Sequence, residues 1–219
     1  MTNRSLKVKQ LVACGLAAVL ILFAAIAGAT DQSSPQAQLK AAIDSLVEVL
    51  KDESLKGEGQ KPLLEEKITK LFKQQFDMAY TSQLCLGRYW RTISEKEKQE
   101  FITLFTDLLK STYIGKIETY NDEVVRYDDE KLLENKALVK TVIVSKGTEI
   151  PLDYKMVNRG GIWLVYDVII EEVSLVSNYR SQFSSILQKG KFPELLDRIR
   201  NKIAENQADR DQAKGQQLG

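Results

Sequence analysis

The chain has 219 residues, 43% hydrophobic and 28% charged, which limits it to one domain or two small ones. Its formal net charge is +1 and it has no histidine, so the side chain that most often serves as general base and metal ligand is missing. With only Cys14 and Cys85, the chain cannot contain a CxxC zinc or redox motif.

The first 29 residues have the three regions of a secretory signal peptide. Three cations and no acid precede an apolar run at residues 11–27, and Ala27-Gly28-Ala29 then forms a small-residue cleavage site. We therefore predict that residues 1–29 are a cleaved signal peptide and that the protein is periplasmic. An uncleaved membrane anchor is the alternative, because about 20 uncharged residues can just span a bilayer.

Cleavage would also change the charge and the cysteine content. Lys plus Arg would fall from 31 to 28 against 30 acids, a net charge of −2. Proteins that bind nucleic acid carry basic stripes, and this net charge gives no reason to expect one. Cys85 would be the one remaining cysteine, so no internal disulfide could form and the fold would depend on its core.

Four helices are predicted in the first half of the chain. Ser34-Pro35 opens the first, whose apolar residues recur at helical spacing and predict one buried stripe. That stripe consists of Leu39, Ile43, Leu46, Val47 and Leu50. Pro62 starts a second helix, and Asp77 caps a third that ends at Gly87. The capping box Ser94-Glu95-Lys96-Glu97 begins a long amphipathic fourth helix.

From Val124 the apolar pattern changes to a period of two, which predicts strands. We expect a short strand at residues 123–127, a central strand at 138–145 that is apolar on both faces, and a third at 149–158. Gly160-Gly161 predicts a hairpin to the next strand. The apolar run at 162–176 is too long for one strand, so we interpret it as two strands joined by a bend or bulge near residues 167–170.

Two closing helices are expected at residues 179–188 and 192–204, followed by a disordered polar tail at residues 206–219. Helices followed by a curved antiparallel sheet and further helices indicate the α+β class rather than βαβ alternation. One domain is therefore predicted over residues 30–205.

Three stretches together resemble the MlaC family of phospholipid-binding proteins, also called toluene-tolerance proteins. The first comprises Phe76-Asp77-Met78-Ala79 and Leu86-Gly87-Arg88-Tyr89-Trp90-Arg91, and the second runs from Phe101 to Tyr113. The third comprises Ile150-Pro151-Leu152-Asp153-Tyr154, the run from Trp163 to Val168, and the run from Val173 to Phe183. The resemblance spans about residues 39–196. Glu172 departs from it, because a glycine is frequent there, and its bend should be less tight.

The resemblance implies a nuclear-transport-factor-like curved sheet that packs with an N-terminal helical subdomain around a deep apolar pocket. It also implies a periplasmic carrier, not an enzyme, that holds phospholipid as cargo and needs no cofactor. Its implied partners are an outer-membrane lipoprotein–porin complex and an inner-membrane ABC transporter with MCE domains. We expect a monomer. A hopanoid-associated, membrane-anchored branch is also similar, so the lipid class and the anchoring stay open.

A lipid pocket has to be apolar, because charges inside it would be costly. One acyl chain of about 15 methylenes gains about 12 kcal/mol on burial, at roughly 0.8 kcal/mol per methylene. Periodicity alone cannot separate pocket from core at any one position. The candidate lining is Met78, Leu84, Phe101, Phe105, Leu108, Val142, Val144, Leu152, Tyr154, Met156, Trp163, Val165, Val168, Val173 and Leu175.

Two sets of charged residues could have a functional or a structural role. Asp167 could serve as the general base of a small-molecule enzyme on the same curved-sheet fold, although we favour a structural carboxylate paired with Arg180 or Arg91. Arg88, Arg91 and Arg180 could hold a phosphate at the pocket mouth, although structural hydrogen bonds or a solvated face are favoured for them too. A structural adaptor that binds only protein is a third reading.

Overall fold

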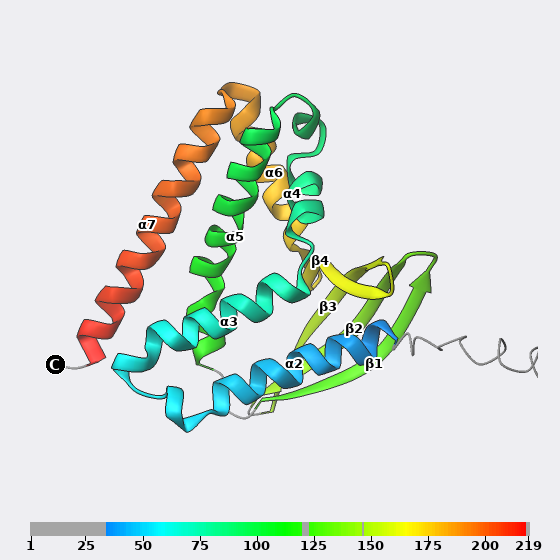
Figure 1. Cartoon of the computed structure of the whole chain (residues 1–219), viewed down its shortest axis with the longest axis vertical. Coiled ribbons are helices and arrows are strands. Elements are labelled where there is room, and N and C mark those ends of the chain that lie inside the picture. The colour runs from blue at the N-terminus through cyan, green and yellow to red at the C-terminus, as the bar shows by residue number, and fades with distance from the viewer. Residues whose placement is uncertain (1–33, 120–122, 146, 218–219) are drawn as a thin grey trace, which may run out of the picture. The chain divides into compact units, whose positions relative to one another are not determined.

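The computed structural model describes residues 34–119, 123–145 and 147–217, so the predicted signal peptide lies outside the described residues. Helices precede and follow a five-stranded antiparallel sheet (Figure 1), which confirms the α+β class. The helical elements are α2 (Pro35–Lys51), η1 (Glu53–Leu55), η2 (Glu58–Gln60), α3 (Lys61–Gln75), α4 (Met78–Leu86), η3 (Gly87–Arg91), α5 (Glu95–Glu118), α6 (Leu175–Lys189) and α7 (Phe192–Gln217). The strands are β1 (Val124–Leu133), β2 (Lys136–Ser145), β3 (Thr148–Arg159), β4 (Ile162–Ile170) and β5 (Val173–Ser174).

Helix starts follow the capping residues read from the sequence. Ser34 Oγ accepts from Ala37 N at 3.2 Å, and Asp77 Oδ1 accepts from Tyr80 N at 2.9 Å. Ser94 and Glu97 form the predicted capping box at α5. These bonds satisfy backbone N–H groups that have no partner within the helix, so each helix begins where its cap lies. Among the described residues, no helix is long and apolar enough to cross a membrane.

The sheet is a simple meander in the order β1-β2-β3-β4-β5, curved and not closed. β1 is twice as long as the predicted strand and contains a bulge between Tyr127 and Asp129. The hairpin at Gly160-Gly161 is confirmed, and both glycines have positive φ values of 65° and 97°. A second bulge lies in β4, where Met156 pairs with Val165 but Lys155 pairs with Asp167. Bulges of this kind bend a sheet and increase its twist.

The long apolar run forms two strands, as predicted, but the predicted position of the bend, residues 167–170, is wrong. The bulge lies at Tyr166, and the chain then reverses in a two-residue turn at Glu171 and Glu172, with φ values of 46° and 69°. Both values lie in the left-handed region, as a tight type I′ hairpin requires. Glu172 therefore does not loosen the bend, and the apolar residue Leu175 begins α6 instead of ending a strand.

The tail prediction is also wrong, because α7 continues as one helix to Gln217. Its side chains are polar, which suggested disorder, but Asn206 and Arg210 bond to α5 and α3. Figure 1 shows α7 beside α5, while α2 lies over one face of the sheet and α3 runs beside α2 to meet β4 at its C-terminal end. Polar contacts with α5 and α3, rather than an apolar stripe, stabilise this part of the helix.

Candidate binding site

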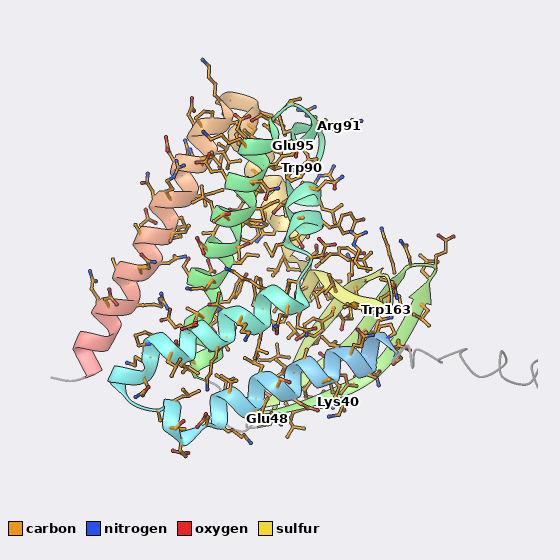
Figure 2. The ribbon with its side chains drawn as sticks, viewed as in Figure 1. Lys40, Glu48, Trp90, Arg91, Glu95 and Trp163 are labelled. Carbon is orange, nitrogen blue, oxygen red and sulfur yellow. The ribbon has the colours of Figure 1, made fainter. Side chains whose placement is uncertain are left out.

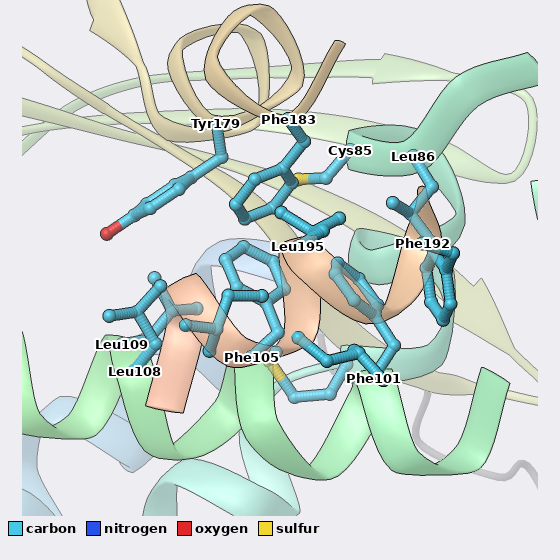
Figure 3. Packing of buried hydrophobic residues seen from close by; sticks show 13 residues of the cluster. Cys85, Leu86, Phe101, Phe105, Leu108, Leu109, Tyr179, Phe183, Phe192 and Leu195 are labelled. Carbon is cyan, nitrogen blue, oxygen red and sulfur yellow. The ribbon is translucent and has the colours of Figure 1, made fainter. Parts of the chain in front are cut away.

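Four of the predicted lining residues belong to a filled helical core. Met78 from α4 and Phe101, Phe105 and Leu108 from α5 are all at most 7% exposed. Figure 3 shows the Phe101 and Phe105 rings facing α6, where the Phe105 ring centroid lies 5.0 Å from that of Tyr179. Rings packed edge to face at such distances leave no room for a ligand. We therefore assign these four residues to the core that holds α4, α5, α6 and α7 together.

Four more predicted residues lie in a second cluster between the sheet and α2. These are Met156, Trp163, Val165 and Val168. Leu39 is their partner on α2, and it is 3% exposed. Gln38 fixes this contact, because its side-chain oxygen accepts from Trp163 N at 2.9 Å and its nitrogen donates to Gly161 O at 3.0 Å. Figure 2 shows Trp163 beside this helix, while Lys40 and Glu48 mark its outer face.

Three predicted residues, Leu152, Tyr154 and Leu175, are half-buried and pack against the edge of this second cluster. Further along α2 the apolar stripe that we assigned to the core is also only half-buried. Together they form what we call the apolar strip: Ile43, Leu46, Val47 and Leu50 of α2, with Tyr127, Ile143, Ile150, Leu152 and Tyr154 on the sheet. The sheet members share the face of Ala137 and Val139, because cross-strand partners point to the same side.

Two predicted residues lie on the wrong face of the sheet. Val142 pairs with Arg126, and Val144 pairs with Val124, which is 63% exposed. Arg126 forms ion pairs with Asp128 and Glu149 on that outer face. Because β2 alternates, Val142 and Val144 point away from α2. Because β2 is apolar on both faces, the sequence alone could not show which of its residues face α2.

The two remaining predicted residues lie outside both clusters. Val173 is 56% exposed at the start of β5, so it does not line an interior space. Leu84 is half-buried in α4 and belongs to neither cluster. Conversely, the sequence analysis did not assign to the pocket the strip residues on α2. It also did not assign Tyr127, Ile143 and Ile150 of the sheet to it. Their spacing was visible, but a half-buried apolar stripe and a buried one have the same period.

The polar groups of the strip are the hydroxyls of Tyr127 and Tyr154, and both hydroxyls stay neutral near pH 7. Burial, with a contribution from nearby Asp44, raises the pKa of Tyr127 to about 12. Burial likewise raises the pKa of Tyr154. The hydroxyl of Tyr127 is buried and has no hydrogen-bond partner among the described residues. The strip therefore offers an uncharged surface, which suits apolar chains better than ions.

Asp167 is held as a structural carboxylate. It is 4% exposed and accepts from Lys155 Nζ at 3.1 Å, Ser174 Oγ at 2.7 Å and Val176 N at 3.0 Å. It therefore fixes the start of α6 to β3 and β4. The expected pairing with Arg180 or Arg91 is wrong, since Lys155 is the ion-pair partner. Both carboxylate oxygens are engaged, so the geometry does not favour a general base.

The three arginines do not gather at the apolar strip. Arg88 donates to Tyr89 Oη at 3.0 Å, and the Arg180 guanidinium lies against Gly87, where an added Cβ would be 3.2 Å from Nε. Figure 2 shows Arg91 near the start of α5, well above Trp163 in the view. Structural and solvated roles fit these side chains better than phosphate binding at the strip.

Two open hollows occur on the outside of the helices. One of about 610 Å³ is lined by α3, including Glu65, and by Lys110 of α5, and one of about 460 Å³ is lined by serines of α6 with Arg180 and Gln188. Neither contains a predicted lining residue. Across the described ranges, no three His, Cys, Asp or Glu side chains come together as a metal site. The apolar strip is therefore our candidate site.

Comparisons with known proteins find a family model and several relatives. The family model described as "MlaC protein" matches residues 40–201. The Haemophilus influenzae "Intermembrane phospholipid transport system binding protein MlaC" is 21% identical over 193 residues, covering 85% of this chain and 90% of that protein. The Pseudomonas putida "Toluene tolerance protein ttg2D" is 26% identical over 104 residues, covering 47% and 48% of the two chains.

A solved structure shares the fold. It is that of a phospholipid-binding protein from Ralstonia solanacearum in complex with a phospholipid, and it matches with a TM-score of 0.72. The two chains are 24% identical, and the match covers 80% of this chain and 99% of the other. The helices and the curved, open sheet are thus a known combination.

Proposed function

The chain belongs to the MlaC family, and on this premise we propose that it is a periplasmic phospholipid carrier, with acyl chains held against the apolar strip. The strip supports this proposal because inward-facing apolar side chains of helix and sheet stay half-buried there. A carrier needs such a surface, since covering it with an acyl chain gains roughly 25 cal/mol per Å² of apolar area.

The relatives' names guide the proposed route. One is a binding protein of an intermembrane phospholipid transport system, and the structural relative holds a phospholipid. We propose that this chain shuttles phospholipid between an outer-membrane lipoprotein–porin complex and an inner-membrane ABC transporter with MCE domains. The Haemophilus influenzae relative is named for phospholipid transport and the structural relative for phospholipid binding, which supports a carrier over an enzyme. A cleaved signal peptide at residues 1–29 would supply the route to the periplasm.

Lipid extraction and native mass spectrometry of the protein purified from a Gram-negative host test the proposal. We expect phospholipid at about one molecule per chain, and loss of that lipid when Leu46 is replaced by Asp. Protein that is folded but always free of lipid would exclude the carrier function. The intact mass of the periplasmic protein tests the predicted localisation and cleavage, because the mature chain should begin at or next to Thr30.

A further inference from the structure

The end of α7 extends past the family match, which stops at residue 201, and connects two other helices. Asn206 Nδ2 donates to Ser111 Oγ and Thr112 Oγ1 of α5, each at 3.1 Å. One turn later, Arg210 Nη1 lies 3.3 Å from Glu65 Oε1 of α3. This segment therefore contacts α5 and α3 through successive turns of one helix face.

The link between Arg210 and Glu65 is partly shielded from water. Their side chains are 21% and 23% exposed, whereas most ion pairs of the described residues lie on open surface. The stem of Arg210 lies on α5 at Gly115, where an added Cβ would be 3.7 Å from Cδ. A side chain longer than a methyl group at Gly115 would thus displace the arginine. Shielding of this kind strengthens an ion pair relative to an exposed one.

The Arg210–Glu65 pair acts on a part of α3 that lies far from where this helix is fixed to the sheet. The C-terminal end of α3 is fixed at the sheet, where Phe76 forms a bridge with Val165 and Asp77 N donates to Val165 O at 2.9 Å. Between these ends, α3 packs mainly on α2. Glu65 lies eleven residues before Phe76, about 16 Å along the helix at 1.5 Å per residue. A tie at Glu65 therefore acts on α3 far from its fixed end.

We propose that the segment of α7 from Ile203 to Arg210 is a strap that sets the position of α3 and, through it, of α2 over the apolar strip. Asn206 and Arg210 are then positioning residues for ligand entry. Separating α2 and α3 from the sheet moves the N-terminal part of α3, and this requires the Arg210–Glu65 pair to break. The consequence for lipid rests on the proposed function, but the mechanical link does not.

The test variant is Arg210→Met, which keeps an unbranched stem and removes the charge. Its matched control is Arg200→Met, because Arg200 also joins α7 to α5, through Glu100, without touching α3. Two quantities are measured for both variants. One is the hydrogen-exchange rate of the α3 amides. The other is the rate at which a phospholipid with a fluorescent acyl chain transfers from phosphatidylethanolamine vesicles to the protein. We expect Arg210→Met to accelerate both about three- to tenfold, the range for losing one partly shielded ion pair. Arg200→Met should change neither.

Reversal of the charges completes the experiment. Glu65→Arg combined with Arg210→Glu should return both rates toward wild type, and Glu65→Gln replaces Arg210→Met if the latter does not fold. Unchanged α3 exchange in a folded variant, or equal acceleration in the control, would overturn the strap. Faster α3 exchange with an unchanged lipid rate would overturn its role in ligand entry. If the wild-type protein takes up no phospholipid, the proposed function fails, while hydrogen exchange still decides whether the strap holds α3.

Discussion

Gln38 and Trp163 join the first described helix to the sheet across 125 positions of the chain. The Gln38 side chain accepts from Trp163 N at 2.9 Å and donates to Gly161 O at 3.0 Å, so one carboxamide binds both the turn of the β3–β4 hairpin and the start of β4. The first turn of α2 is therefore fixed, while its later turns carry the half-buried residues of the apolar strip.

Replacing Gln38 with Leu should lower the free energy of unfolding by about 1–3 kcal/mol. The Trp163 N–H and the Gly161 carbonyl would lose their partner where water is scarce, and an unsatisfied buried polar group costs about that much. Urea unfolding followed by tryptophan fluorescence measures the change. Gln36→Leu is the control, because Gln36 bonds to Glu130 through its backbone N–H. An equal loss in both variants would contradict the role assigned to the Gln38 carboxamide.

Aspartate placed in the core and in the strip should have opposite consequences. Val165 is 1% exposed, so Val165→Asp buries an unpaired charge and should unfold the protein or destabilise it severely. Leu46 is half-buried, so the carboxylate of Leu46→Asp can reach water, and the fold should survive with its lipid lost. Thermal unfolding and bound-lipid content are measured for each. A folded Leu46→Asp protein with full lipid content would move the site elsewhere.

Tyr127 should make the fold sensitive to alkali. Burial raises its pKa to about 12, above the value of about 10 for an unfolded tyrosine. The folded state thus holds the phenolic proton more tightly, and its stability is lost as pH rises from about 10 through 12. Tyr127→Phe should reduce this loss and be at least as stable at pH 7, because the hydroxyl has no partner among the described residues. A steeper alkaline loss in the variant would contradict the assignment.

Cys85 should report unfolding rather than react in the native state. It is 1% exposed, and burial raises its thiol pKa from 9.0 to about 12. Since the thiolate is the reactive form, labelling at pH 8 with a disulfide reagent should require opening of the protein. The labelling rate in increasing urea should therefore follow the unfolding transition seen by fluorescence. Rapid stoichiometric labelling of the fully folded, mature protein would show that α4 and α6 do not cover this thiol.

Asp167→Asn tests the alternative in which Asp167 is a general base. The variant removes the charge that faces Lys155 at 3.1 Å, so we expect a loss of about 1–3 kcal/mol in stability. Phospholipid content should stay at the wild-type level, because Asp167 lies outside the apolar strip. Loss of function in a variant that is as stable as wild type would revive the enzymatic reading.

Local signals in the sequence predicted much of the fold. Ser34, Asp77 and Ser94 cap their helices through their own side chains, and Gly160-Gly161 forms a turn that needs positive φ. These features depend on residues within a few positions of one another, which a sequence displays directly. The residue pattern placed the bend at residues 167–170 rather than at Glu171–Glu172, because glutamate rarely adopts positive φ and carries no turn signal. Only the family resemblance put a bend at Glu172.

The site could be predicted only in part, because burial is decided by residues far apart in sequence. Phe101 and Leu46 both lie on apolar helical stripes, yet Phe101 is fully enclosed by aromatic rings of α6 and α7, while Leu46 stays half-buried. Val142 and Val139 likewise alternate on a strand that is apolar on both faces. The helix after Ala204 was missed because Asn206 and Arg210 stabilise it through polar contacts to α5 and α3.

The meander order of the strands also bears on how the molecule assembles. Each strand pairs with its neighbour in the chain, so the sheet can form through a series of short loop closures with little entropic cost. The contact between Gln38 and Trp163, by contrast, closes a loop of more than a hundred residues. Folding that begins with the hairpins therefore leaves the inner face of the sheet uncovered until α2 arrives. The apolar face is thus open to other chains until α2 packs on it, and that interval is where aggregation would compete with folding.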